Sequence, residues 1–161
     1  TGIILNNRLT GFSLDPASPN IIAPGKRPAH TLNAFTAVHA DGSLYLVGGT
    51  PGANIQVQSN LQLITNMIDL KMNVQEATEA PRWQHLNAPG QSSDEEKGLG
   101  VLEIENRVSE AVFEQLRAKG HDVRPLAAWG HGSSVQMMEV LSNGTFAFGS
   151  DPRCEGHAAG I

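Results

Sequence analysis

Large apolar residues recur at helical spacing in the segment from Asn54 to Leu70. Val57, Leu61, Ile64 and Ile68 follow one another at intervals of four, three and four residues. Since an α-helix has 3.6 residues per turn, this spacing places the four side chains on one apolar face of a helix. A glycine-rich stretch directly before the segment is expected to form a strand-to-helix junction.

Two shorter helices are predicted from residues that are typical of helix ends. Asn73 and Glu76 have the spacing of a capping box, so we expect a short helix that ends before the next proline. Ser109 is placed to cap a helix that runs to about Lys119, and Gly120 stands where a glycine often terminates a helix. The residues of this helix that are expected to face inward are Val112, Phe113 and Leu116.

Short apolar runs between turn residues predict the strands. Residues 35–47 are expected to form a hairpin around an Asp-Gly turn, and residues 133–141 and 145–149 a second hairpin around Ser-Asn-Gly. Residues 101–105 alternate as a single strand, and residues 1–5 have the pattern of the middle of a strand. Because hairpins dominate, the sheet is expected to be largely antiparallel, and the blocks of helices favour an α+β fold.

The segments between these elements are predicted to be loops. Residues 13–34 contain four prolines together with Asn, Ser and Gly, and residues 87–100 are polar. We find no internal repeat. The chain of 161 residues has the size of one domain, which we expect to span residues 1–161.

Composition excludes several classes of protein. With 40% hydrophobic and 17% charged residues the chain is typical of a globular protein. The net charge of −5 and the lack of a Lys/Arg-rich run argue against nucleic-acid binding, and no apolar stretch approaches a membrane span. Cys154 is the single cysteine, so neither an intramolecular disulfide nor a zinc ribbon is expected. The six histidines lack metal-ligand spacing, and we expect no metal and no cofactor.

The junction at residues 49–54 (Gly-Thr-Pro-Gly-Ala-Asn) is the most informative local feature. Small residues let a ligand approach the backbone, and the helix that follows offers free N–H groups and a positive dipole end. This combination suits a carboxylate, a phosphate or a developing oxyanion. The Gly-Lys-Ser/Thr ending of a phosphate-binding loop is lacking, and a tight turn that needs positive φ explains the same residues.

Three polar clusters are further candidates. Residues 26–31 (Lys-Arg-Pro-Ala-His-Thr) bring two cations, an imidazole and a hydroxyl together, which suits a small acidic substrate or a solvated loop. Asn6-Asn7-Arg8 and Asp151-Pro152-Arg153 suit carboxylate binding or turn and capping roles equally well. Thr1 has the residue type of an N-terminal nucleophile, but its strand context favours coincidence.

Five segments together resemble one family. Leu5-Asn6-Asn7-Arg8, Lys26-Arg27-Pro28, Gly49-Thr50-Pro51-Gly52-Ala53, the 73–82 segment ending in Ala-Pro-Arg, and Ser150-Asp151-Pro152-Arg153 are similar to motifs of γ-glutamyltransferase small subunits. They occur in the family's order and cover essentially the whole chain. The resemblance implies part of a four-layer αββα N-terminal-nucleophile hydrolase fold, completed by a large subunit from the same precursor.

The resemblance also implies the chemistry. Such precursors cleave themselves before a threonine, whose hydroxyl then forms an acyl-enzyme and whose amine serves as base. The family's threonine precedes the Leu-Asn-Asn motif by roughly thirty residues, whereas four residues precede it here, so we expect a nucleophile outside this chain and not Thr1. For the same reason we expect the chain to need the larger partner in order to reach its native fold.

By resemblance, the substrate-binding residues fall on named positions. The amides of Gly52 and Ala53 correspond to the oxyanion hole, provided that φ of Ala53 is negative. The residues that bind the substrate carboxylate correspond to His30 and Thr31, beside Asn7. Where the family holds the glutamyl ammonium with Gln or Glu and with Asp, this chain has Arg8 and Gly11. The acyl group is therefore expected to carry a carboxylate and no amine, as in glutaryl- or oxamate-like amides.

Other functions remain open from the sequence. The chain fits a subunit of an amide hydrolase or acyltransferase that acts on γ-glutamyl, glutaryl or oxamate-like substrates. It also fits a non-catalytic relative that binds small acids or has a structural role. The compartment stays open, since any signal peptide is expected at the start of the large subunit. Family members that process glutathione are often periplasmic or secreted, and the cytoplasm is the alternative.

Overall fold

A computed structural model describes residues 2–4, 6–86 and 100–160 of the chain. Thr1, Leu5, Ile161 and all but the last residue of the predicted loop over residues 87–100 lie outside the described residues. The chain divides into two compact units, Thr1–Leu32 and Asn33–Ile161, and each is described by itself. The second unit holds every strand that the structure describes and combines helices with sheets, so the α+β class is confirmed.

The first unit consists of turns and one short helix. Residues Arg8–Gly11 form a 3-10 helix, and Ser13 and Ile21 make an isolated parallel bridge, so the prediction of a turn-rich loop is confirmed. Lys26 Nζ donates to the carbonyl oxygens of Pro19 and Ile21 at 2.6 and 3.0 Å. The expected strand at the start of the chain is wrong for residues 2–4, which are exposed and have no strand partner within the described part of this unit.

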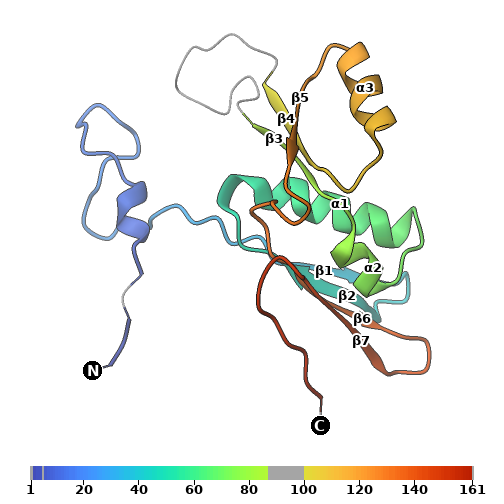
Figure 1. The fold of residues 1–161 in the computed structure, drawn as a ribbon. Coiled ribbons are helices and arrows are strands. Elements are labelled where there is room, and N and C mark those ends of the chain that lie inside the picture. The colour runs from blue at the N-terminus through green and yellow to red at the C-terminus, as the bar shows by residue number, and fades with distance from the viewer. Residues whose placement is uncertain (1, 5, 87–99, 161) are drawn as a thin grey trace. The chain divides into compact units, whose positions relative to one another are not determined.

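A four-stranded antiparallel sheet organises the second unit (Figure 1). Its strands lie in the order β1-β2-β6-β7, and both predicted hairpins, β1–β2 and β6–β7, are confirmed. The Gly144 backbone, with φ of +82°, closes the second hairpin in the conformation that glycine adopts at no steric cost. The bounds of these strands are β1 Phe35–Val38, β2 Leu44–Gly49, β6 Gln136–Val140 and β7 Phe146–Ser150.

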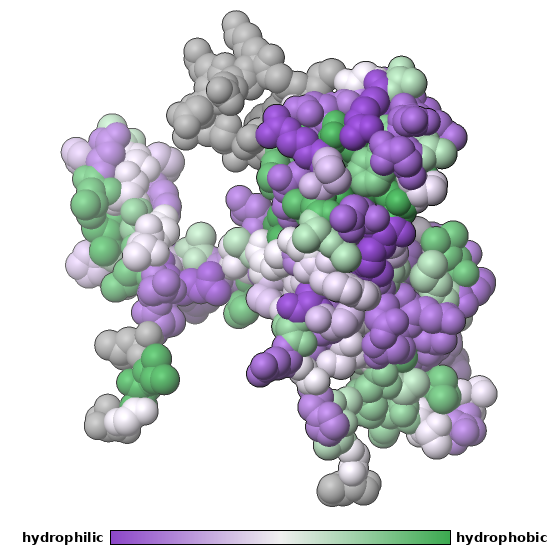
Figure 2. All heavy atoms as spheres, viewed as in Figure 1, coloured by the Kyte–Doolittle hydropathy of each residue, from purple (hydrophilic) through white to green (hydrophobic). Residues whose placement is uncertain are grey.

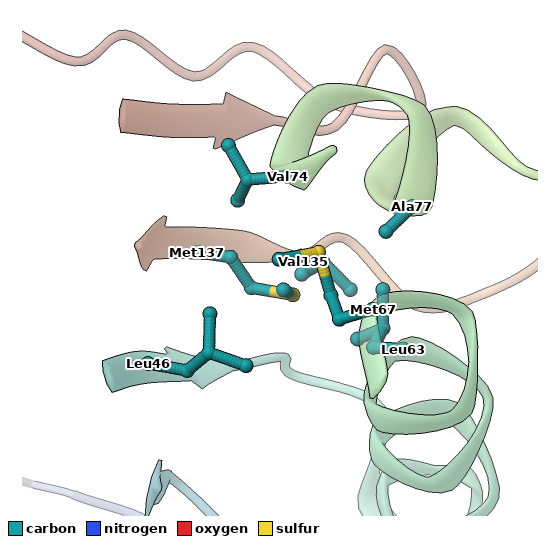
Figure 3. Packing of buried hydrophobic residues seen from close by; sticks show 7 residues of the cluster. All are labelled: Leu46, Leu63, Met67, Val74, Ala77, Val135 and Met137. Carbon is teal, nitrogen blue, oxygen red and sulfur yellow. The ribbon is translucent and has the colours of Figure 1, made fainter. Parts of the chain in front are cut away.

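Two helices, α1 (Gln56–Ile68) and α2 (Val74–Glu79), pack on one face of this sheet. The predicted capping box before α2 is confirmed, since the Asn73 side chain accepts from the N–H of Glu76 and the Glu76 carboxylate accepts from the N–H of Asn73. Figure 3 shows the apolar residues between the helices and the sheet, and none of these side chains carries a polar group that would need a hydrogen-bond partner. They are Leu46, Leu63, Met67, Val74, Ala77, Val135 and Met137.

Three further strands form a second sheet in the order β3-β4-β5. Strand β4 (Val101–Glu105) was predicted, whereas β3 (Trp83–Leu86) and β5 (Asp122–Leu126) were not. The β4–β5 pair is parallel, because helix α3 (Glu110–Ala118) connects the two strands as a crossover. Four of the five strand pairs among the described residues are antiparallel, so the expectation of a largely antiparallel architecture is confirmed, with β4–β5 as the exception.

Helix α3 packs on this sheet through Phe113, which contacts the core formed with Ile104 and Val123. Leu116 packs against the same cluster, as predicted. Val112 is exposed, so its predicted inward position is wrong: it lies one residue from Phe113 and hence about 100° around the helix. Gly120 follows the helix with φ of +92°, which confirms the predicted helix end.

The outer edge of β3 pairs with side chains of α1. Gln62 donates from Nε2 to the Trp83 carbonyl at 2.9 Å and accepts from the Trp83 N–H at 3.0 Å. Gln58, one helical turn earlier, makes the same pair of bonds with His85 at 3.0 and 2.7 Å. The two carboxamides occupy the positions that the backbone of a neighbouring strand would take, and they join α1 to the second sheet.

Candidate functional site

The predicted anion-binding junction lies between β2 and α1. Gly52 has φ of +136°, and a Cβ at this position would lie 2.8 Å from Ile55 Cγ1. Residues Ala53–Ile55 then form a single 3-10 turn that leads into α1 at Gln56. Both the backbone conformation and the close approach of Ile55 require glycine at position 52.

Two consecutive amides of the junction lack an acceptor. Within the described residues, the backbone N–H groups of Gly52 and Ala53 donate to no carbonyl or side chain, while the Gly52 carbonyl accepts from Ile55 N–H at 3.1 Å. Unpaired N–H groups at the start of a helix can bind an oxygen that carries negative charge. Whether they do so in this protein stays a prediction.

Ala53 differs from the expectation of negative φ. Its φ is +48°, in the left-handed region, where the Cβ of alanine approaches the following carbonyl. Gly52 and Ala53 are thus two successive residues with positive φ between β2 and α1. The condition placed on Ala53 is therefore wrong, although its N–H remains without an acceptor in the described part of the chain.

The junction rests on the loop that precedes β6. Thr50, which is nearly buried, accepts the Ser134 N–H through Oγ1 at 2.9 Å and donates its hydroxyl to the Pro51 carbonyl at 2.7 Å. The Thr50 hydroxyl thus fixes the backbone directly before Gly52 to a segment more than eighty residues later in the sequence.

A buried ionic network lies behind this loop, and Asp151 is one of its two carboxylates. Asp151 Oδ2 accepts from Arg82 Nη1 at 2.5 Å and from Val135 N–H at 2.7 Å. Its other oxygen accepts from the N–H of Arg153 at 3.0 Å and from Arg153 Nη1 at 2.9 Å. Arg82 Nη1 also donates to Ser133 Oγ at 2.8 Å, which connects the network to the loop under the junction.

Glu105 is the second carboxylate and is fully buried. It forms a two-pronged pair with Arg153, in which Nε and Nη2 donate at 2.6 and 2.5 Å. Arg107 Nη2 and the backbone N–H groups of Arg82 and His131 donate to the same carboxylate at 2.8, 3.1 and 3.2 Å. Because five donors already bind the Glu105 carboxylate, it has no free lone pair with which to activate a nucleophile. We therefore assign the network a structural role.

The electrostatics of the network favour the charged forms of its acids. Burial alone would raise the pKa of Glu105, but hydrogen bonds from Arg153 and Arg107 outweigh it and hold the pKa below its usual range. The same balance lowers the pKa of Asp151, where burial is outweighed by the N–H groups of Val135 and Arg153 and by the charge of Arg82.

His131 and Ser133 form a hydroxyl–imidazole pair next to this network. Ser133 Oγ lies 2.7 Å from His131 Nδ1, and the Ser133 N–H donates to the same nitrogen at 3.1 Å. Because a backbone N–H cannot accept, Nδ1 carries a lone pair and the ring is neutral. Burial, reinforced by the charge of Arg82, lowers the pKa of His131 to about 4. Both residues are buried, which argues against a Ser–His nucleophile.

We expect His131 to make stability depend on pH. Since its pKa is about 6.5 when unfolded and about 4 when folded, the unfolded chain binds the extra proton between these values. Neutral His131 therefore contributes about 3 kcal/mol to the free energy of unfolding above pH 6.5, and this contribution is lost as the pH falls toward 4. Urea titrations of the complete protein across this range should show the loss.

His131→Asn keeps an acceptor for Ser133 but does not titrate, so it should flatten this part of the pH profile. His121→Asn, the same substitution at an exposed histidine, is the matched control. A profile of the His131→Asn protein that is as steep as that of the wild type would contradict the assignment.

The other predicted site residues belong to the first unit. Arg8 Nη1 donates to Thr31 Oγ1 at 3.3 Å, so the structure brings together a cation and a hydroxyl that are 23 residues apart. Asn7 accepts the Thr10 hydroxyl through its carbonyl, and His30 is exposed. Lys26 is engaged with carbonyl groups of its own loop, which supports a structural role for that cation.

Two other kinds of site are absent from the described residues. Within residues 2–4, 6–86 and 100–160, no group of three or more His, Cys, Asp or Glu side chains is placed to hold a metal ion. No helix among the described residues has the length and hydrophobicity needed to cross a membrane.

The sequence pointed to parts of the ionic network without revealing it. Arg82 and the pair Asp151 and Arg153 each lie in a recognised motif, but their mutual contacts were not predicted. Glu105 was assigned only to a strand. A carboxylate at the end of an otherwise alternating strand, followed by Arg107, was the one available signal.

Comparisons with known proteins agree with these motifs. A family model described as gamma-glutamyltranspeptidase matches residues 1–161. The chain is 39% identical to the oxamate amidohydrolase proenzyme of Klebsiella pneumoniae, with 99% of the chain aligned, and 34% identical to the glutathione hydrolase proenzyme of Escherichia coli, with 95% aligned. The chain spans 29% and 26% of the length of these two relatives.

Solved structures show the same similarity. A gamma-glutamyltranspeptidase mutant of Helicobacter pylori superposes with a TM-score of 0.74 at 28% identity, covering 95% of this chain and 82% of that chain. A cephalosporin acylase of Bacillus halodurans superposes with a TM-score of 0.75 at 29% identity, covering 97% of this chain and 28% of that chain. The α+β architecture described above is thus part of the N-terminal-nucleophile hydrolase fold of these proteins.

Proposed function

Because the chain belongs to the gamma-glutamyltranspeptidase family, we propose that it is one part of an autoprocessed amide hydrolase or acyltransferase. Its partner is the remainder of the same precursor, which supplies the nucleophilic threonine. The observation that carries the proposal is the pair of unpaired N–H groups on Gly52 and Ala53 at the start of the 3-10 turn that leads into α1.

These two amides are proposed to act in the first step of the reaction, the formation of the acyl-enzyme. The threonine hydroxyl attacks the amide carbonyl of the substrate while the threonine amine takes up its proton. The carbonyl oxygen gains negative charge in the transition state, and the N–H groups of Gly52 and Ala53 donate to it there. The tetrahedral intermediate then collapses: the threonine ammonium gives its proton to the leaving amine, and an ester of the threonine hydroxyl remains, which water or a second amine then cleaves.

The acyl group is proposed to carry a carboxylate without an ammonium group. Arg8 stands where the family holds the glutamyl ammonium, and its guanidinium donates to Thr31, a proposed carboxylate ligand. A second cation next to Arg8 is repelled, whereas a carboxylate gains charge-assisted hydrogen bonds from Arg8, Thr31 and His30. The relative named oxamate amidohydrolase agrees with such an acyl group.

The test is a comparison of two anilides that differ only in the amino group. We expect the complete processed protein to hydrolyse the glutaryl anilide with a kcat/KM at least about 30-fold higher than that of the γ-glutamyl anilide, which corresponds to about 2 kcal/mol. Arg8→Gln removes the cation and should narrow the ratio of the two kcat/KM values, while Arg27→Gln in the same unit is the control.

Three outcomes decide the proposal. A preference for the γ-glutamyl compound would overturn the substrate class but not the reaction. Hydrolysis of neither anilide, nor of oxamate, by a correctly processed protein would favour a non-catalytic relative. If Arg8→Gln and Arg27→Gln changed the ratio of kcat/KM on the two anilides equally, the proposed role of Arg8 in selecting the acyl group would be contradicted.

A further inference from the structure

The Thr50 hydroxyl makes two hydrogen bonds, and both partners are backbone groups. Its oxygen accepts from the N–H of Ser134 at 2.9 Å, and its proton is donated to the carbonyl oxygen of Pro51 at 2.7 Å. Because a backbone N–H can only donate and a carbonyl can only accept, the direction of both bonds is fixed. Thr50 is 9% exposed, so water has little access with which to replace either partner.

The carbonyl of Pro51 belongs to the same peptide group as the N–H of Gly52. A peptide group is planar, and this one is trans, so its carbonyl and its N–H point in opposite directions. A hydroxyl that holds the carbonyl oxygen therefore sets the direction of the N–H as well. This N–H is one of the two at the junction that have no acceptor within the described residues.

The local chain opposes rotation of this peptide group only weakly. The group turns through ψ of Pro51 and φ of Gly52, and glycine adopts φ of either sign. The proline ring fixes φ of Pro51 but leaves its ψ free. Among the described residues, the Thr50 hydroxyl is the one group that donates to the Pro51 carbonyl. The hydroxyl is therefore the contact that holds the peptide group in its orientation.

The donor to this hydroxyl, the N–H of Ser134, is fixed from both sides by the buried ionic network. The preceding residue, Ser133, accepts from Arg82 Nη1 through its Oγ at 2.8 Å. The following residue, Val135, donates its N–H to Asp151 Oδ2 at 2.7 Å. The Ser134 N–H is thus held at a defined place, and the hydroxyl that it binds has little freedom to turn.

We infer that Thr50 is a positioning residue, whose hydroxyl aims the Gly52 N–H at the carbonyl oxygen of the substrate. The hydrogen bonds run in one direction, from the Ser134 N–H through the hydroxyl to the Pro51 carbonyl and through the peptide group to the Gly52 N–H. Hydrogen bonds in such a chain polarise one another, so this N–H becomes a better donor to a developing oxyanion. The inference rests on the proposed function, in which this N–H is an oxyanion-hole donor.

Thr50→Val tests this role, because valine keeps the β-branched shape and lacks the hydroxyl. In the complete processed protein we expect kcat on the glutaryl anilide to fall about 10-fold or more with KM nearly unchanged, because the contact acts mainly in the transition state. Thr50→Ser keeps the hydroxyl and should recover most of the lost kcat. Steady-state kinetics from limiting to saturating substrate separate the two constants.

An inhibition constant distinguishes this role from a loss of folded protein. In 4-boronobutanoate a boronic acid replaces the reacting carbonyl of a glutaryl group, and its tetrahedral adduct with a hydroxyl resembles the transition state. Its affinity for Thr50→Val should weaken by a factor similar to the fall in kcat. A smaller fraction of folded protein would lower the apparent kcat but leave this affinity unchanged.

Thr145→Val is the matched control. The Thr145 hydroxyl also donates to one oxygen, Asn143 Oδ1, at 2.7 Å, but Thr145 is exposed at the turn of the β6–β7 hairpin. Strand β6 begins beside the junction, where Gln136 pairs with Gly49, so this turn lies at the opposite end of the strand. Figure 2 shows the distal end of the hairpin at the surface, among hydrophobic atoms. We expect wild-type values of kcat, KM and boronate affinity.

Crystal structures of the complete Thr50→Val and Thr50→Ser proteins show the peptide group directly. We expect the Pro51–Gly52 peptide to turn in the valine variant and to keep its orientation in the serine variant. An unchanged kcat in Thr50→Val, or a peptide group that keeps its direction there, would overturn the inference while the proposed function stands. If the wild-type protein hydrolyses neither anilide, nor oxamate, the proposed function fails, and the orientation of the peptide group alone decides whether Thr50 positions it.

Discussion

Replacing Gly52 by valine in the complete protein is expected to lower kcat about 100-fold or more, the loss that follows removal of one oxyanion-hole donor. Gly52 has φ of +136°, which a β-branched residue cannot adopt without strain, and its Cβ would meet Ile55 at 2.8 Å. The turn must therefore shift, and the Gly52 and Ala53 amides turn away from the position of the carbonyl oxygen. Single-turnover kinetics on the glutaryl anilide measures the effect.

Two further variants show that the loss is specific. Ala53→Gly relieves the positive φ of +48° and keeps the N–H group, so kcat should be retained. His30→Ala removes a proposed carboxylate ligand that acts both before and during the reaction, so it should mainly raise KM. An unchanged kcat in Gly52→Val together with a lost kcat in His30→Ala would contradict the roles of both segments. Co-purification of the two parts of the precursor confirms that Gly52→Val still assembles.

The second large effect is expected on stability. Glu105→Gln replaces a fully buried carboxylate that accepts from Arg153 and Arg107. The substitution removes the carboxylate partner of Arg107 and leaves Arg153 with Asp151 alone. We expect a loss of about 3–5 kcal/mol in the free energy of unfolding, as for other broken buried pairs. Urea denaturation of the complete protein at pH 7 measures it.

Glu110→Gln is the matched control for this substitution. Glu110 pairs with Arg117 at 3.1 Å, but both side chains are exposed, and such pairs contribute at most about 1 kcal/mol. If the two glutamine variants had equal stability, the network around Glu105 would not hold the second unit together as described.

Elements that depend on neighbouring residues were predictable from the sequence. The hairpins around Asp-Gly and Ser-Asn-Gly, the capping box at Asn73 and the glycine after α3 are each specified by a few consecutive residues. Strand β5 was not predictable in this way, because Asp122–Leu126 includes a proline and its partner is supplied by the crossover through α3. Strand β3 depends on β4 and on the side chains of α1.

The site was predictable only in part, for a similar reason. Family motifs located Gly52 and Ala53, and the structure places them at a turn with unpaired N–H groups. The positive φ of Ala53 could not be predicted, because nothing in the residue type requires it. The ionic network could not be predicted either, since Arg82 and Asp151 are 69 residues apart and meet only through the fold.

The glutamines that bind β3 have a consequence for how this chain avoids self-association. A free edge strand is a template for another strand. Gln58 and Gln62 occupy the N–H and carbonyl groups of Trp83 and His85 from within the same chain. Once α1 has packed against β3, these groups are no longer available to pair with a strand of another molecule. Helix α1 protects the edge through its glutamines, since it has no charged residues.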